Sequence, residues 1–147
     1  MKKIFLVLFV LFAGTSLFAQ IRKIPAAVTD ALKQKYPEAQ NVEWKDKVTY
    51  FEAQFTMGGA EMSADFSSKG EWQETEKKIT YDALPEEIKD GFKKSKFSDW
   101  TPGTVTIIIK NDKDTLYKLY VEKSSIVQKK FLYFKTDGQL DHDAPGI

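Results

Sequence analysis

The stretch from Thr49 to Phe66, TYFEAQFTMGGAEMSADF, decides the fold of this chain. On both sides of its central Gly58-Gly59 pair, apolar and polar residues alternate with a period of two, which is typical of a strand with one covered and one wet face. Adjacent glycines favour a two-residue hairpin turn, because both turn positions take left-handed backbone angles. The stretch therefore predicts an antiparallel hairpin that turns one apolar face toward a core.

Two segments with helical spacing flank this hairpin. One opens with Ile24-Pro25 and the other, about 60 residues later, with Leu84-Pro85, and a proline suits the first turn of a helix. In both segments small or apolar residues follow the proline at the third, sixth and seventh positions, which lie on one helix face. These residues are Val28, Ala31 and Leu32 in the first segment and Ile88, Gly91 and Phe92 in the second.

Runs with strand-like alternation follow each predicted helix. The sequence thus predicts an α+β fold of two tandem helix-plus-antiparallel-sheet repeats, covering about 24–79 and 84–143. The segments Phe66–Gly70 and Phe134–Gly138 are matching landmarks that end in glycine. Because each repeat offers only one helix, one face of its sheet is expected to stay open.

The same alignment of the two repeats places aromatic side chains on the open sheet face. If Leu119 and Leu132 face the helices, their neighbours in the strands point the other way. Uncovered aromatics are unusual on a monomer, and tyrosines concentrate at binding surfaces. The candidate ligand-binding face therefore consists of Tyr50, Tyr120, Phe131 and Tyr133. The alternatives are a different strand phase, or a helix or second copy that covers these rings.

Composition narrows the function classes. The chain has 147 residues, 42% hydrophobic and 14% aromatic, enough for one domain with a packed core. The absence of cysteine excludes disulfides, thiolate zinc sites and cysteine nucleophiles, and the single histidine, His142, leaves little room for catalytic triads. A formal net charge of +1 argues against nucleic-acid binding. These observations predict a domain without catalytic residues or cofactor.

Two groups of carboxylates are candidates for catalysis or metal binding. Glu74 and Glu76 share one face of a strand and can perturb each other's protonation, although wet strand faces carry such pairs routinely. Asp137, Asp141 and Asp143 are a candidate calcium site, because oxygen ligands suit this ion. Their order does not fit the EF-hand loop, and a solvated turn and tail is the alternative.

The N-terminus reads as an export signal. Lys2 and Lys3 precede the apolar run Ile4–Phe12, and small residues then lead to Ala19. The apolar run is shorter than the roughly 20 residues that span a bilayer. The sequence therefore predicts a signal peptide over 1–19, cleavage after Ala19, and a mature chain 20–147 that is periplasmic or secreted, without membrane insertion.

A set of core and turn residues carries a family resemblance. The pattern is Ile24-Pro25-x-x-Val28, Lys35-Tyr36-Pro37-x-Ala39, Trp44, Tyr50 and Phe66-x-x-x-Gly70-x-Trp72-x-x-Thr75-Glu76. It resembles the PepSY-like, β-lactamase-inhibitor-like family of exported bacterial proteins. The resemblance implies a fold similar to that of β-lactamase inhibitory protein, whose tandem helix-plus-sheet units form a concave surface. It also implies binding or inhibition rather than catalysis, with a peptidase or another envelope hydrolase as the class of partner.

From the residues and the resemblance together we predict a periplasmic binding or inhibitor-type module that recognises a protein, peptide or other envelope ligand through its sheet face. The alternatives are a self-associating structural protein of the envelope and, third, a hydrolase.

Overall fold

The computed structural model describes residues 22–112 and 114–146, so the predicted signal peptide lies outside the described residues. The elements follow the chain in the order α1 (Ala26–Lys35), β1 (Gln40–Asp46), β2 (Phe51–Met57), β3 (Ala60–Phe66), β4 (Trp72–Ile79), η1 (Tyr81–Ala83), α2 (Glu86–Lys94), β5 (Thr101–Lys110), β6 (Thr115–Lys123), η2 (Ser124–Ile126), β7 (Gln128–Lys135) and β8 (Leu140–Pro145). The chain is thus α+β, as predicted, and the Gly58-Gly59 pair forms the turn between β2 and β3.

All the strands belong to one antiparallel sheet. Its eight strands lie in sequence order from β1 to β8, so that every strand pairs with its neighbour in the chain. The segment with η1 and α2 separates β4 from β5, yet these two strands pair from Glu74 opposite Lys110 to Ile79 opposite Val105. The two halves therefore form one continuous sheet, a question that the sequence left open.

Strand β8 corrects the prediction for the C-terminus. Leu140–Pro145, for which a solvated tail was the alternative to a calcium site, pairs with β7 from Phe134 opposite Leu140 to Lys130 opposite Pro145. As an edge strand rich in charged residues it lacks the apolar alternation by which a half-buried strand is recognised.

Both helices cover the same face of the sheet. Val28 and Leu32 of α1 are buried against β2 and β3, and Ile88 and Phe92 of α2 are buried with residues of β5 to β7. The two cores are separate clusters on one face of the sheet, which runs from Ala64 in β3 through Thr75 in β4 to Ile109 in β5. The other side of the sheet, which we call the helix-free face, carries neither α1 nor α2, the two α-helices of the described residues.

A glycine turn fixes each helix on the sheet. Gly70, between β3 and β4, and Gly138, between β7 and β8, have φ values of 84° and 83°. A Cβ atom on Gly70 would lie 2.5 Å from the carbonyl oxygen of Ala27 in α1, and one on Gly138 would lie 2.1 Å from that of Glu87 in α2. Only glycine combines this backbone conformation with so close an approach, which gives the two matching landmarks of the sequence a common physical reason.

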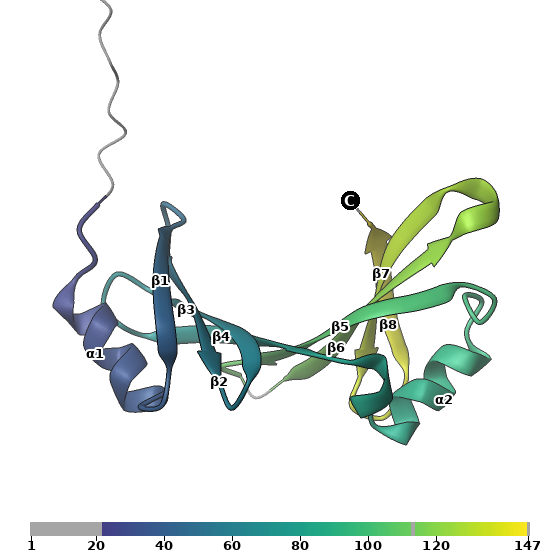
Figure 1. Ribbon diagram of the computed structural model, residues 1–147, viewed down its shortest axis with the longest axis horizontal. Coiled ribbons are helices and arrows are strands. Elements are labelled where there is room, and N and C mark those ends of the chain that lie inside the picture. The colour runs from purple at the N-terminus through teal and green to yellow at the C-terminus, as the bar shows by residue number, and fades with distance from the viewer. Residues whose placement is uncertain (1–21, 113, 147) are drawn as a thin grey trace, which may run out of the picture.

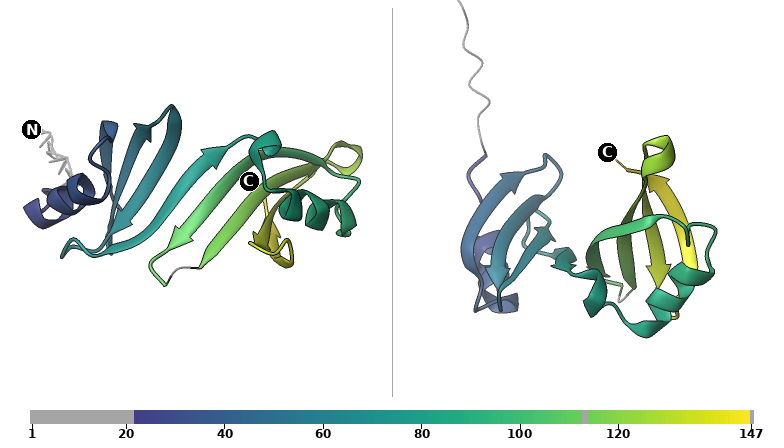
Figure 2. Two further views of the ribbon diagram at one scale, coloured as in Figure 1. Left: turned by 90° about the horizontal axis from the view of Figure 1, so that it is seen from below. Right: turned by 45° about the vertical axis from the view of Figure 1, so that its right-hand side comes forward.

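The sheet is strongly bent. Figure 1 shows its two ends rising on the side away from the helices, with α1 and α2 on the outer, lower sides. The views from below and from the right in Figure 2 agree with this arrangement. The helix-free face is therefore concave, and the β1–β2 turn and the β6–β7 connection lie at its two raised ends.

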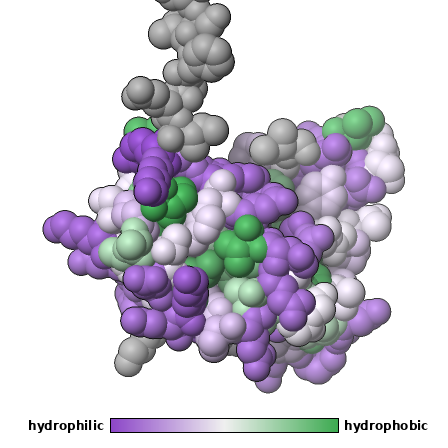
Figure 3. Space-filling view, turned by 60° about the vertical axis from the view of Figure 1, so that its left-hand side comes forward, coloured by the Kyte–Doolittle hydropathy of each residue, from purple (hydrophilic) through white to green (hydrophobic). Residues whose placement is uncertain are grey.

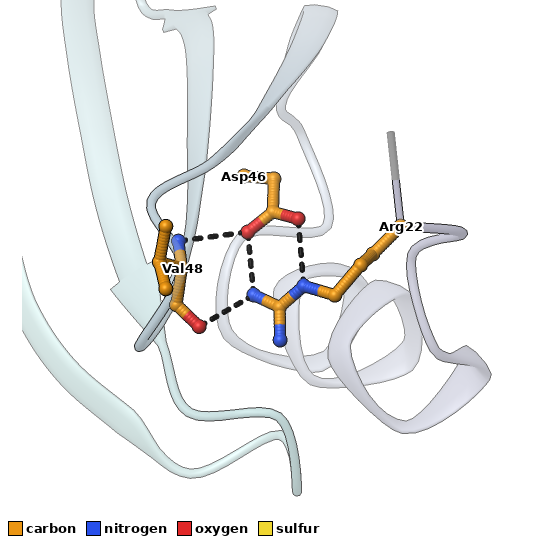
Figure 4. Close-up of polar contacts among 3 residues, drawn as sticks. All are labelled: Arg22, Asp46 and Val48. Carbon is orange, nitrogen blue, oxygen red and sulfur yellow. Dashed lines mark hydrogen bonds and ion pairs between the residues drawn. The ribbon is translucent and has the colours of Figure 1, made fainter. Parts of the chain in front are cut away.

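An arginine beside the first strand secures one of these ends. The guanidinium of Arg22 donates to both carboxylate oxygens of Asp46 at 2.7 and 2.5 Å and to the carbonyl oxygen of Val48 at 2.7 Å (Figure 4). Asp46 also accepts the backbone N–H of Val48 at 2.8 Å, and the guanidinium lies 4.9 Å from the centre of the Phe51 ring. These contacts fix the β1–β2 turn on which Tyr50 lies.

Candidate binding face

Three of the four predicted aromatic residues come together on the helix-free face. Tyr120 of β6 lies opposite Phe131 of β7 with ring centres 5.7 Å apart, and Tyr133 follows two residues later on the same face. The intervening Leu132 is fully buried in the core on the other side, which establishes the strand phase.

His142 joins these rings from β8. Its imidazole stacks on Tyr133 with centres 4.2 Å apart and an interplanar angle of 11°, and its Nδ1 lies 2.7 Å from a carboxylate oxygen of Asp141. We call Tyr120, Phe131, Tyr133 and His142 the aromatic cluster. The position of His142 beside these rings could not be predicted from the sequence, because β8 was not predicted.

A glycine and a lysine shape the surroundings of the aromatic cluster. A Cβ atom on Gly103 of β5 would lie 2.8 Å from Cδ1 of Tyr120, so that the missing side chain leaves room for the ring. The ammonium of Lys118 lies 5.3 Å from the centre of the Phe131 ring and 3.6 Å from a carboxylate oxygen of Glu76 on β4. Cation–π attraction and ion pairing thus connect the cluster with the acidic part of the face.

The other part of the face carries a group of carboxylates around a shallow hollow. Residues of β2, β3 and β4 line it together with the tyrosine that precedes β2. They are Tyr50, Glu52, Ser63, Asp65, Glu74 and Glu76. We call the carboxylates Glu52, Asp65, Glu74 and Glu76 the acidic group. A second hollow shares Glu52, Ser63 and Glu76 and extends toward β1.

Burial and the charges of neighbouring carboxylates raise the pKa of two residues of the acidic group, Asp65 and Glu74. Partial burial, followed by the charges of Glu52, Glu74 and Glu76, raises the pKa of Asp65 to about 6. Burial first and then Glu76 also raise the pKa of Glu74, while Lys110 and Lys118 oppose this change. Carboxylates that lie this close together at neutral pH would be stabilised by cationic side chains of a binding partner.

Tyr50 lies apart from the other predicted residues. It borders the acidic group near β2, whereas the aromatic cluster begins on β6, four inter-strand steps away. At about 4.8 Å per step this amounts to roughly 19 Å. The predicted four residues therefore form a group of three and a separate single residue.

The candidate calcium residues are engaged in separate contacts. Asp137 accepts the backbone N–H of Gln139, Asp141 pairs with Lys135 at 3.5 Å, and Asp143 pairs with Lys130. Across residues 22–112 and 114–146, no group of three acidic, histidine or cysteine residues is arranged to hold a metal ion.

The side of the molecule that Figure 3 shows is mostly polar. In the space-filling view of Figure 3, hydrophilic side chains dominate, and apolar ones appear in small separate patches. No helix in the described part of the chain is long and apolar enough to cross a membrane. The helix-free face offers a partner aromatic rings, local apolar surface and charged groups, a combination suited to recognition.

Solved structures from Bacteroides resemble this fold. A β-lactamase-inhibitory-protein-like (BLIP-like) protein from Bacteroides fragilis is 28% identical with a TM-score of 0.79, over 86% of this chain and 89% of that one. A putative periplasmic protein from Bacteroides eggerthii is 26% identical with a TM-score of 0.79, over 84% and 90% of the two chains. A DUF2874 family protein from Bacteroides uniformis shares the fold at 24% identity and a TM-score of 0.78, over 82% and 88%. Among curated proteins, none matches the chain.

The match to a family covers most of the sheet. The model described as "Putative beta-lactamase-inhibitor-like, PepSY-like" matches residues 49–142, from the residues just before β2 into β8. This segment contains α2, the acidic group and the aromatic cluster. The chain therefore belongs to the PepSY-like, β-lactamase-inhibitor-like family.

Proposed function

We propose that this protein is a periplasmic binding or inhibitor-type module that recognises a protein or peptide through its helix-free face. The observation that carries the proposal is the aromatic cluster, which is partly exposed on a concave sheet face that α1 and α2 leave uncovered. Tyrosine and phenylalanine give a binding surface large apolar area at low cost in side-chain entropy. Family membership and the likeness to a BLIP-like protein support an inhibitor-type role.

The geometry favours binding over catalysis. A hydrolase of the serine or metal type would need an activated nucleophile or an open metal site held by a rigid second shell. The imidazole of His142 is already committed to stacking on Tyr133 and to Asp141. The protein is therefore proposed not to be an enzyme, and a peptidase or another envelope hydrolase is the proposed class of partner.

We also infer that the chain is exported and internally duplicated. The Bacteroides eggerthii relative, described as periplasmic, supports cleavage of 1–19 and a periplasmic location for the mature chain. The equivalent glycine turns beneath α1 and α2 support two repeats over about 24–79 and 84–143.

The proposed function is tested with the mature chain, residues 20–147, as bait in a cell-envelope extract of the producing bacterium. Mass spectrometry identifies the retained proteins. Because the structure separates Tyr50 from the cluster, one variant changes Tyr120, Phe131 and Tyr133 to alanine and another changes Tyr50 alone. Asp30→Ala on the exposed side of α1 is the matched control, and circular dichroism checks that every bait is folded.

We expect one protein to be retained by the native chain and by Asp30→Ala but lost with the triple variant. If it is a peptidase, its activity is measured with increasing amounts of the mature chain to test inhibition. Unchanged retention after all four aromatic residues are altered would disprove the role of the face. Sedimentation velocity distinguishes the self-associating alternative, which would show a mass that rises with concentration.

A further inference from the structure

Two valines have backbone angles that valine rarely adopts. Val48, in the β1–β2 turn, has a φ of 71°, and Val127, after η2, has a φ of 48°. Both side chains are almost fully in solvent, with exposed fractions of 79% and 86%. The one other described residue with positive φ that is not glycine is Asn41, a residue type that tolerates this conformation.

Neither valine stabilises the isolated chain. A β-branched residue in the left-handed region is strained, because its Cβ and methyl groups crowd the backbone. An exposed apolar side chain gains nothing from burial that could offset this strain. Asparagine or glycine at either position would therefore make the isolated protein more stable. Backbone strain that a fold retains often accompanies contact with another molecule.

The two valines lie at the two raised ends of the helix-free face. The turn with Val48 and the connection with Val127 rise on the same side in Figures 1 and 2. The hairpin of β1 and β2 is five inter-strand steps from that of β6 and β7, about 24 Å at 4.8 Å per step. Arg22 and Asp46 fix the first of these turns, so that Val48 is presented on a supported backbone.

We propose that Val48 and Val127 are contact residues for a folded protein that bridges the two ends of the helix-free face. This inference rests on the proposed function and names the class of partner and two further residues. A small ligand cannot contact two turns that are five inter-strand steps apart, and a straight peptide or a flat lipid surface lying across both turns would not reach the floor of a concave face. A convex protein surface can contact both ends and the floor.

The charges of the face specify the chemistry of this partner. The acidic group lies near the end that carries Val48. The cations that oppose it are Lys47, which pairs with Glu52 at 3.6 Å, and Lys110 and Lys118 of β5 and β6. A partner surface with basic side chains facing Asp65 and apolar side chains at both turns would match this distribution.

The first arm of the test is photo-crosslinking in the producing bacterium. The photoreactive p-benzoyl-phenylalanine is introduced in place of Val48, of Val127 or, as a control on the helix side, of Lys33. We expect both turns to crosslink to the same protein and the control to crosslink to neither that protein nor lipid. No adduct at either turn, two different proteins, or adducts with lipid only would overturn the inference.

The second arm separates strain from contact. Val48→Asn and Val127→Asn relieve strain and remove the apolar surface, whereas Val48→Thr and Val127→Thr keep the branched Cβ and remove only apolar character. We expect the asparagine variants to raise Tm by roughly 3–6 °C per site. The threonine variants should leave Tm unchanged, and all four should weaken binding of the crosslinked protein about three- to tenfold by calorimetry.

The proposed function and this inference fail in different ways. If the crosslinked protein binds the valine variants with native affinity but loses the triple aromatic variant, the helix-free face is the binding surface and the inference about the two turns is wrong. If binding depends on the valines and not on the aromatic cluster, the inference holds and the proposed role of the cluster is wrong. An unchanged or lowered Tm in both asparagine variants would also overturn the inference about Val48 and Val127.

Discussion

Replacing Asp65 by asparagine is expected to stabilise the protein at neutral pH. Asp65 is half-buried on β3, between Glu52 on β2 and Glu74 on β4. Burial, followed by the charges of neighbouring carboxylates, raises its pKa from 3.8 to about 6. For a group fully shielded from water, this difference corresponds to ~3 kcal/mol at pH 7. Because Asp65 is still partly accessible to water, screening reduces the expected gain in unfolding free energy to about 1–2 kcal/mol.

The pH dependence has a definite sign. Between pH 3.8 and about 6 the folded protein binds the proton of Asp65 more tightly than the unfolded chain does. The protonated Asp65 therefore makes its full contribution to the free energy of unfolding below pH 3.8, and this contribution is lost as the pH rises through about 6. Asparagine does not ionise, so Asp65→Asn should not show this loss. The free energy of unfolding of the variant should therefore exceed that of the native chain by more at pH 7 than at pH 4.

Thermal unfolding of the mature chain followed by circular dichroism at pH 4, 5, 6 and 7 measures this difference. An increase of about 4–8 °C in Tm at pH 7, shrinking toward pH 4, is the expected result. The matched control is Glu61→Gln on the same strand, because Lys78 lowers the pKa of Glu61 and the sign of its pH dependence is opposite. An unchanged or lower Tm for Asp65→Asn at pH 7 would refute the view that this carboxylate is held at a cost to stability.

Three further predictions concern the supports of the face. Gly138→Ala forces a Cβ against the backbone of α2, and urea denaturation should show a loss of about 2–4 kcal/mol in unfolding free energy. Gly58→Ala is the control and should lose much less, because its added Cβ meets no atom within 4 Å. Arg22→Ala removes the main cause of the low pKa of Asp46, which is about 2, so that an NMR titration should find it closer to 3.8. Thr75→Val removes a buried hydroxyl that bonds a tyrosine and a tryptophan, and chemical denaturation should show a loss of about 1–3 kcal/mol, while Thr75→Ser should retain most of the native stability.

Much of the fold could be predicted because the decisive signals are local. The alternation in Thr49–Phe66 and the double glycine predicted β2, β3 and the turn between them, and the structure confirms all three. The prolines before α1 and α2 and the spacing of Val28 and Ile88 predicted both helices. Pairing of β4 with β5 could not be predicted, because it depends on how the chain returns after α2, and no short-range pattern encodes this return.

The site was predicted only in part, for physical reasons that differ from residue to residue. Strand alternation fixed the side of the sheet for Tyr120, Phe131 and Tyr133, but it contains no information on the number of strands that separate Tyr50 from them. His142 was missed because its strand has no apolar periodicity. Glu74 and Glu76 were noticed as a pair, whereas the perturbation of Asp65 comes from strands on both sides of it and requires the register.

The two sides of the sheet differ in how well the isolated chain buries its apolar side chains and pairs its polar ones. On the helix side large apolar residues such as Phe66 and Phe134 are fully buried, and within the described residues no buried side-chain polar atom lacks a hydrogen-bond partner. The helix-free face holds a carboxylate with a raised pKa and half-exposed aromatic rings, and strained, exposed valines stand at its ends. Each of these features lowers or fails to increase the stability of the chain alone, and an apolar and basic protein surface would relieve all of them at once. Their concentration on one face supports the proposal that a partner protein covers this face.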